Sequence, residues 1–221
     1  SKDKTLEICR EYAQRFPHIR IHQQERNVGV QGNFRTVLDL ARGSYFFWAG
    51  VDDQWSPSFA SSLVEDLEKH PGTQLAMTSF DRVNEDGTLY DTQRFVEKDS
   101  PNGRPHLNVL LGVTSPLKYN LFLYGLFRTE FIRKAARYLP QTPAWDRVFM
   151  TMLSLATPIR YVDRVLHQHG LSGLPVNKRY PEEAIFKRRN GKSYWFLFLE
   201  TFRAMVETTV RSELVPPRRK W

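Results

Sequence analysis

Hydrophobic residues recur every three to four positions in several stretches of the chain, a spacing typical of amphipathic helices. In residues 56–72 these positions are Phe59, Leu63 and Leu67, after a Ser-Pro start and before a Pro-Gly stop. The same reasoning predicts further helices at residues 1–16, 30–42 and 144–156, and a long helix or helical pair over 181–214. Ser1 or Asp3 is placed to cap the first of them.

Shorter apolar or alternating runs lie between the helices and predict strands. The expected strands are residues 18–24, 44–51, 73–83 and 158–170, with a turn at 84–88. Residues 91–106 are expected to form a loop, 107–139 to hold at least one helix and one strand, and 215–221 to fray. Because helices and strands alternate in the first third of the chain, we expect an α/β fold with a mainly parallel sheet.

Composition supports a folded protein with a sizeable core. Of 221 residues, 41% are hydrophobic and 13% aromatic, which argues against general disorder. The single cysteine, Cys9, excludes an internal disulfide framework and favours a reduced, cytoplasmic setting. The sequence has no apolar run of about 18 residues and no start that resembles a signal peptide.

The net charge of +8 favours an anionic partner. Nucleic acid, phosphorylated ligands and anionic lipid all qualify by charge alone. Nucleic acid is the least favoured, because the chain shows no aromatic and basic platform of the kind that binds single strands.

Two adjacent carboxylates, Asp52 and Asp53, end the most hydrophobic run, "FFWAGVDDQW". In α/β sheets, ligands bind beyond the carboxyl ends of the strands. Carboxylates placed there can hold Mg²⁺ or Mn²⁺, with phosphate oxygens completing the shell. The alternative is a solvated turn in which Asp53 caps the following helix.

The stretch "ERNVGVQGN" (25–33) is a second candidate site. Gly29 and Gly32 allow a close approach of the backbone, Asn27 and Asn33 offer amide groups, and a helix start follows. The stretch matches neither a P-loop nor a dinucleotide-binding fingerprint. It is therefore either a cradle for an anion or an ordinary loop before a helix.

The order of these motifs resembles the family 2 glycosyltransferases of GT-A fold. "S-x-D-x-T-L-E-I" is followed by "N-x-G-x-x-x-N-F" and "A-R-G-x-Y-F-x-W-A-x-x-D-D-x-W-x-P-x-F". "YGLFRTE", "WDRVFM" and "RYVDRVLHQHGLSG" come later in the family's order. The resemblance covers roughly residues 1–173 and implies transfer of a sugar, with inversion, from a nucleotide-diphosphate sugar to an acceptor hydroxyl.

The resemblance also implies roles for individual residues. Asp53, with Asp52, matches the motif that holds a divalent cation, Mg²⁺ or Mn²⁺, and Asp52 also faces the donor. The remaining implied roles are Asn27, Gly29, Asn33 and His169 in nucleotide-sugar binding and Asp146 as general base. Alternatives remain open for Asp146 as a helix cap, for His169 as a surface residue, and for Arg128 as either a phosphate ligand or a structural ion pair.

The chain departs from the family pattern at its start, at Val51 and in the last motif. It begins inside the "S-x-D-x-T" segment, so we expect the two earliest strands of the fold to be missing. The family's frequent "R-x-H" reads His167-Gln168-His169 here. We expect an N-terminally incomplete GT-A-like domain over 1–175 and a helical C-terminal extension over 176–221. A catalytically inactive module that binds a partner is the alternative function.

The C-terminal extension mixes basic and aromatic residues, among them Trp195, Phe196 and Phe198. Such a helix could lie on an anionic membrane surface or close over the core. With the resemblance, this suggests a glycan or lipid-linked acceptor in polysaccharide or cell-envelope synthesis, and a cytoplasmic protein at the inner face of the membrane.

Overall fold

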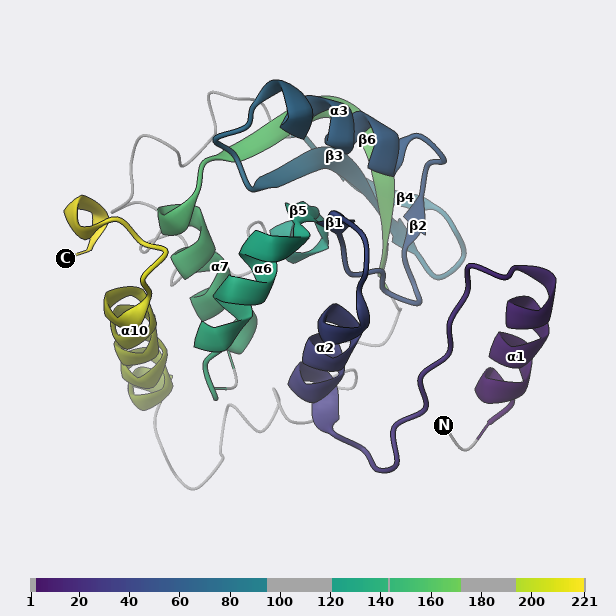
Figure 1. Cartoon of the computed structure of the whole chain (residues 1–221), viewed down its shortest axis with the longest axis horizontal. Helices are drawn as coiled ribbons and strands as arrows, with labels where there is room; N and C mark the ends of the chain where they lie inside the picture. Colours follow the sequence, from purple (N-terminus) through teal and green to yellow (C-terminus); the bar gives the residue numbers. More distant parts are fainter. Residues whose placement is uncertain (1–2, 95–120, 143, 172–193, 221) are drawn as a thin grey trace. The chain divides into compact units, whose positions relative to one another are not determined.

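The computed structural model describes residues 3–94, 121–142, 144–171 and 194–220 (Figure 1). The chain divides into two compact units, Ser1–Val37 and Leu38–Trp221.

The first unit contains helix α1 (Thr5–Arg15) and the start of α2 (Gly29–Leu40), both expected from the sequence. Asp3 Oδ1 accepts a hydrogen bond from the Thr5 amide at 3.1 Å, so Asp3 satisfies one free amide at the start of α1. The strand predicted over residues 18–24 is wrong, because this segment has no regular structure. A strand needs a pairing partner, and none of the described strands pairs with it.

The second unit is built on a six-stranded sheet in the order β1-β5-β3-β6-β2, with β4 paired to β3. The strands are β1 (Tyr45–Phe46), β2 (Gln54–Trp55), β3 (Leu75–Asn84), β4 (Leu89–Gln93), β5 (Leu126–Arg128) and β6 (Ile159–Leu171). The α/β class is confirmed. The sheet is mixed rather than mostly parallel, because among the described pairs only β3 and β6 run parallel.

Strand β6 bulges against β3 in the middle of their ladder. Thr78 lies opposite Val162, but Ser79 lies opposite Val165 and Phe80 opposite His167. A bulge of this kind bends the strand and re-aims the side chains that follow it. It therefore sets the direction of the residues at the far end of β6, which include His167 and His169.

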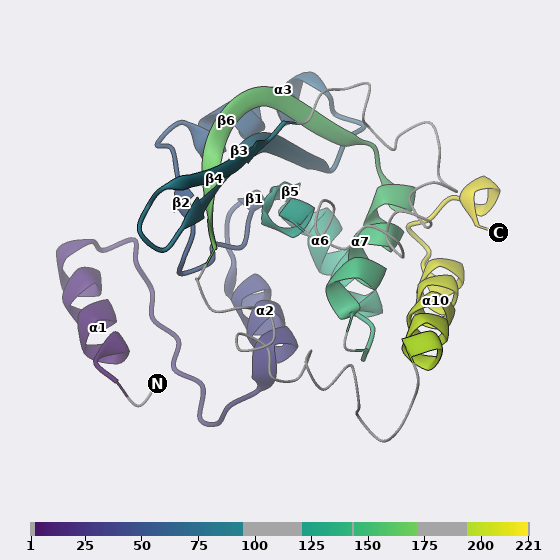
Figure 2. The same cartoon turned by 180° about the vertical axis from the view of Figure 1, so that it is seen from behind.

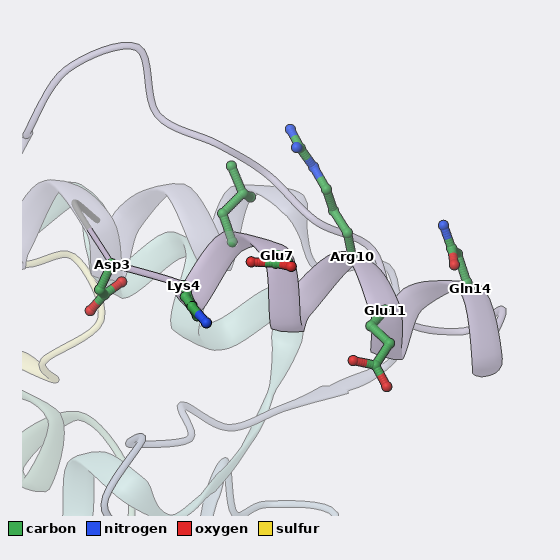
Figure 3. Close-up of a pocket in the computed structure, with 7 residues that line it drawn as sticks. Asp3, Lys4, Glu7, Arg10, Glu11 and Gln14 are labelled. Atoms are coloured by element: carbon green, nitrogen blue, oxygen red, sulfur yellow. The ribbon is translucent and has the colours of Figure 1, made fainter.

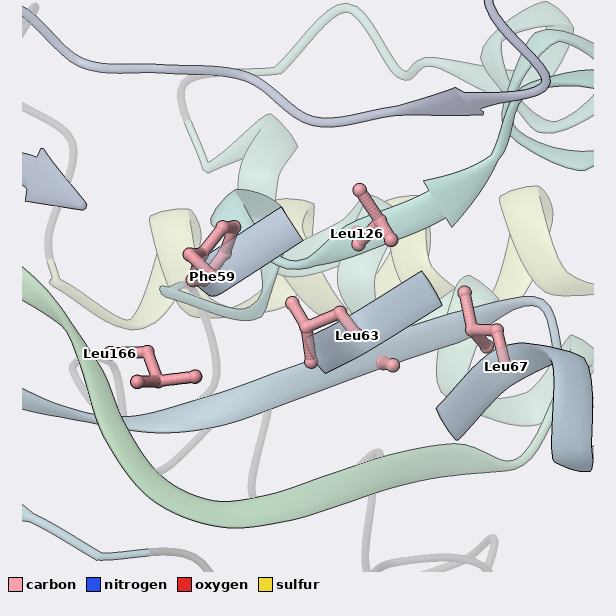
Figure 4. Close-up of a cluster of buried hydrophobic side chains, with 6 residues drawn as sticks. Phe59, Leu63, Leu67, Leu126 and Leu166 are labelled. Atoms are coloured by element: carbon pink, nitrogen blue, oxygen red, sulfur yellow. The ribbon is translucent and has the colours of Figure 1, made fainter. Parts of the chain in front are cut away.

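Helix α3 (Phe59–Lys69) buries one face against the sheet, as its apolar spacing predicted. Phe59, Leu63 and Leu67 are each at most 2% exposed and pack with Leu126 of β5 and Leu166 of β6 (Figure 4). Burial of this many apolar side chains is the main stabilising contribution to the α3–sheet layer.

Further helices lie on the opposite side of β3 and β6 from α3 (Figures 1 and 2). They include α6 (Thr129–Ala135) and α7 (Trp145–Ala156), and α10 (Tyr194–Arg211) packs against α7. Short 3-10 turns occur at Leu121–Tyr124, Ala136–Tyr138 and Pro217–Arg219. The largest buried side chains in this region are Phe122, Phe127, Phe149, Ile132 and Met152.

Two local predictions need correction. Residues 91–93 belong to β4 rather than to a loop. The described tail is docked rather than frayed: Val215 is 1% exposed, and Arg219 Nη1 donates to the Leu155 carbonyl at 3.0 Å. The predicted boundary between residues 175 and 176 and the helix break near 190–191 lie outside the described residues.

Candidate functional site

Asp53 lies at the end of the turn that joins β1 to β2, and its side chain is 1% exposed. It does not cap α3, because the residue at the helix start is Ser58. Its Oδ1 accepts hydrogen bonds from His169 Nδ1 at 2.7 Å and from the Gly170 amide at 3.2 Å. The alternative interpretation, in which Asp53 is a solvated turn residue or a helix cap, is therefore excluded.

The second carboxylate oxygen of Asp53 faces another histidine. His167 Nε2 lies 3.5 Å from Asp53 Oδ2. Neither Oδ2 nor either ring nitrogen of His167 has a hydrogen-bond partner among the described residues, although all three atoms are buried. Buried polar atoms without partners are costly, so a group that bonded to these atoms would stabilise the arrangement.

Strand pairing explains why these three side chains meet. β2 pairs antiparallel with β6, with Trp55 opposite His167 and Gln54 opposite Gln168. His167 and His169 are two residues apart on β6, so they share one face of the sheet. Ligand atoms of Asp53, His167 and His169 all lie within 4.8 Å of one another, which identifies a possible metal site.

Aromatic rings enclose His167. The Trp55 ring stacks on it with centroids 5.3 Å apart and an interplanar angle of 3°. The ring centroids of Phe80 and Tyr124 lie 5.7 and 6.3 Å from that of His167. These contacts fix the orientation of the imidazole.

Electrostatics keep Asp53 ionised. Its burial opposes the charged form, but the neighbouring His167 and His169 outweigh burial and hold the pKa of Asp53 below its usual value. An ionised carboxylate is the form that binds a cation.

Two glycines make room for this turn. A Cβ on Gly50 would lie 2.8 Å from Asp53 Oδ2 and 3.2 Å from Asp52 Oδ1. A Cβ on Gly170 would lie 2.1 Å from the Asp52 carbonyl oxygen. Side chains at these positions would thus displace the paired aspartates.

Asp52 is placed differently from Asp53. Its side chain is exposed, and the possible metal cluster contains Asp53 but not Asp52. Val51, the preceding residue, is fully exposed at 106%. The tip of the turn therefore presents Asp52 to solvent beside the buried carboxylate.

Asn27, Gly29 and Asn33 belong to the first unit. Asn27 Oδ1 accepts a hydrogen bond from the Gly29 amide at 2.8 Å. Gly29 has a φ of 71°, a conformation that favours glycine, and it begins α2. Asn33 is exposed and lies within α2 rather than in the loop before it.

Asp146 lies in the first turn of α7. Its Oδ1 accepts a hydrogen bond from the Arg147 amide at 2.9 Å, so the side chain does interact with the helix start. Burial is the main cause of a raised pKa for Asp146, and it outweighs the hydrogen bond and the charge of Arg147. A carboxyl group with a raised pKa is a stronger base than an ordinary aspartate.

Arg128 has the structural role among its two predicted alternatives. Its guanidinium donates to the carbonyls of Leu67 and Thr73 and to the Tyr45 hydroxyl, and it lies 3.4 Å from Glu68. These contacts tie the end of α3 to β5 and β1.

His167 is the residue that sequence analysis missed as part of the site. The sequence shows it only as a departure from "R-x-H". Its separation from His169 by one residue on a strand was a usable signal, because such residues share a face.

A shallow hollow also lies along α1 (Figure 3). Its lining comes from one helix and the residues just before it: Asp3, Lys4, Leu6, Glu7, Arg10, Glu11 and Gln14. Most of these side chains are exposed and both charge signs alternate, so the hollow has no converging chemistry.

Within the described residues, no helix is both long and apolar enough to cross a membrane. The side chains of Trp195, Phe196 and Phe198 lie outside the described residues.

Comparison with solved structures defines the class of fold. The structure of Staphylococcus aureus TarS 1–349 in complex with UDP-GlcNAc matches with a TM-score of 0.64 and 18% identity, covering 99% of this chain and 58% of TarS 1–349. The complex of the same protein with UDP matches with a TM-score of 0.63 and 20% identity, covering 99% and 56%. The chain thus has the GT-A fold of TarS.

The sequence model of Glycosyl transferase family 2 matches residues 1–133, and the chain belongs to that family. The Mycobacterium tuberculosis protein Rv1520 is 38% identical over 89 residues, which are 39% of this chain and 26% of that protein. The Sinorhizobium fredii protein y4gI is 27% identical over 84 residues, 38% of this chain and 9% of that protein. The chain spans a minor part of the length of these relatives.

Proposed function

We propose that this chain forms the donor-binding and catalytic part of an inverting glycosyltransferase. It transfers a sugar from a nucleotide-diphosphate sugar to an acceptor hydroxyl. The single observation that carries the proposal is the buried Asp53 carboxylate held by His169 at the sheet edge, in a chain of family 2. The complexes of TarS with UDP-GlcNAc and UDP support a nucleotide-sugar as the donor.

Asp53 and His169 are proposed to hold a divalent cation, Mg²⁺ or Mn²⁺, with Asp52 beside them. The residues fit such an ion, because Asp53 Oδ2 is buried without a partner among the described residues and two imidazoles surround it. When bound, the cation would neutralise the diphosphate leaving group. The proposed donor contacts of Asn27, Gly29 and Asn33 rest on the family resemblance and on the positive φ of Gly29.

Asp146 is proposed as the general base. Its carboxylate would accept the proton of the acceptor hydroxyl as that oxygen attacks the anomeric carbon and the nucleotide diphosphate leaves from the opposite face. The raised pKa of Asp146 favours this role, because a more basic carboxylate takes a hydroxyl proton more readily.

The acceptor is proposed to be a glycan or a lipid-linked sugar, in polysaccharide or cell-envelope synthesis on the cytoplasmic side of the membrane.

Exposed apolar side chains on helix α10 support a proposed contact with the membrane surface. Leu199, Phe202 and Val210 are 58, 43 and 48% exposed on it, and Arg218 is exposed in the tail that follows. Sedimentation with vesicles containing anionic lipid tests this contact, and lack of binding would contradict it.

Thermal unfolding with nucleoside diphosphates, UDP first, tests the proposed donor site. We expect Mn²⁺ and UDP together to raise the unfolding temperature more than either alone. Asp53→Asn should abolish this synergy. The control Asp163→Asn changes an exposed aspartate on β6 and should retain it. Absence of stabilisation across the nucleotide panel would instead favour an inactive binding module.

A further inference from the structure

His167 is an unusual residue for the interior of a sheet. Its side chain is fully buried, yet both ring nitrogens lack a hydrogen-bond partner among the described residues. Aromatic rings surround its faces, so no polar neighbour on that side compensates for burial. The nitrogen nearest to a polar group, Nε2, points to the equally unpartnered Asp53 Oδ2 at 3.5 Å.

We propose that His167 is a direct ligand that makes the cation site one of two imidazoles and one carboxylate, selective for a first-row transition ion over Mg²⁺. The inference rests on the cation site of the proposed function and narrows the choice of ion there. The ligand atoms of Asp53, His167 and His169 already lie within 4.8 Å of one another, close enough for one ion to contact all three.

Donor chemistry gives the selectivity. Mg²⁺ prefers oxygen ligands and retains its waters, whereas imidazole nitrogen suits first-row transition ions such as Ni²⁺ and Zn²⁺. Within that series the affinity of a site with nitrogen ligands rises from Mn²⁺ to Co²⁺. With Asp52 outside the cluster, the described protein ligands are two nitrogens and one carboxylate. A bound ion would also satisfy the buried atoms Asp53 Oδ2 and His167 Nε2, and this gain stabilises the loaded state.

The stacked Trp55 has a part in this arrangement. It lies directly opposite His167 across the β2–β6 pair and holds the imidazole nearly parallel to its own ring. A ligand fixed in this way loses little freedom when an ion binds, which favours binding.

Direct metal binding to the full chain, without any nucleotide, tests the proposal. We expect Co²⁺ to bind the metal-free protein with a change in its visible absorption, and Co²⁺ and Mn²⁺ to bind at least about tenfold more tightly than Mg²⁺. In the Mn²⁺-loaded protein, pulsed electron paramagnetic resonance should detect two coordinated imidazole nitrogens.

Substitution of His167 tests its contribution to metal binding. His167→Gln should lower Co²⁺ affinity at least about tenfold, because even the loss of a residue that only hydrogen-bonds to a metal ligand costs that much. The control His22→Gln removes an exposed imidazole and should leave affinity unchanged. If His167→Gln does not fold, the nitrogen count in the unmodified protein decides the question.

One coordinated nitrogen, equal affinities for Mg²⁺ and Mn²⁺, or no metal binding at all would overturn the proposal. These results are distinguishable from failure of the proposed function. UDP binding supported equally well by Mg²⁺ and Mn²⁺ would leave the glycosyltransferase proposal standing while removing His167 from the cation site.

Discussion

At the scale of single residues, the candidate site depends on close approaches that the sequence does not display. The sequence identified Asp53 and His169, and the structure joins them by a 2.7 Å hydrogen bond. It missed His167, because the contact with Asp53 depends on the pairing of β2 with β6 and on the bulge in β6. Pairing between distant segments cannot be read from local spacing.

Gly170→Ala is expected to destabilise the protein by about 1–3 kcal/mol. The new methyl group would lie 2.1 Å from the Asp52 carbonyl, so the turn that carries Asp53 must move. Urea unfolding measures the loss. Gly72→Ala is the matched control, because no atom lies within 4 Å of its added Cβ. Equal stabilities for the two variants would contradict the close packing of this turn.

Asp146→Asn is expected to reduce turnover about 10²- to 10⁴-fold while nucleotide binding persists. In the unmodified protein the rate should fall as the pH drops through the pKa of Asp146, since only the ionised carboxylate accepts a proton. Because burial raises that pKa, the acidic limb should lie at a higher pH than for an ordinary aspartate. A fully active Asp146→Asn variant would remove Asp146 from the role of base.

At the scale of elements, local patterns predicted most helices and the longer strands. Helix α3 has its predicted buried face, and β3 and β6 match the predicted strands closely. The failures are segments whose state depends on distant partners. Residues 18–24 alternate like a strand but pair with no described strand, and the tail is docked through Val215 and Arg219.

Leu63→Ala on α3 is expected to lower the free energy of unfolding by about 2–5 kcal/mol. Leu63 is fully buried between the helix and the sheet, and its removal leaves a cavity. Glu65→Ala, on the same helix, removes an exposed pair with Lys69 and should leave the free energy of unfolding nearly unchanged. Similar losses in the two variants, by urea unfolding, would contradict the assigned face of α3.

Arg128→Gln is expected to destabilise the junction of α3 and β5 by about 1–3 kcal/mol, because it leaves the carbonyls of Leu67 and Thr73 without their donor. UDP affinity of the folded protein should remain unchanged. The control Arg94→Gln changes an exposed arginine and should alter neither quantity. Selective loss of UDP affinity would return Arg128 to its alternative role at the phosphates.

At the scale of the whole molecule, the order of motifs predicted the family and the α/β class before any contact was known. The match of Glycosyl transferase family 2 over residues 1–133 confirms the family. The mixed direction of the sheet was not predictable from the alternation of helices and strands, because antiparallel β1, β2 and β5 are only two or three residues long. Such short strands leave almost no periodic signal.

The most direct measurement is a crystal structure of this chain with Mn²⁺ and UDP, with anomalous scattering recorded at the manganese absorption edge. The account predicts an anomalous peak in contact with both the Asp53 carboxylate and the UDP diphosphate. UDP bound with no manganese at Asp53, or manganese bound elsewhere, would contradict it.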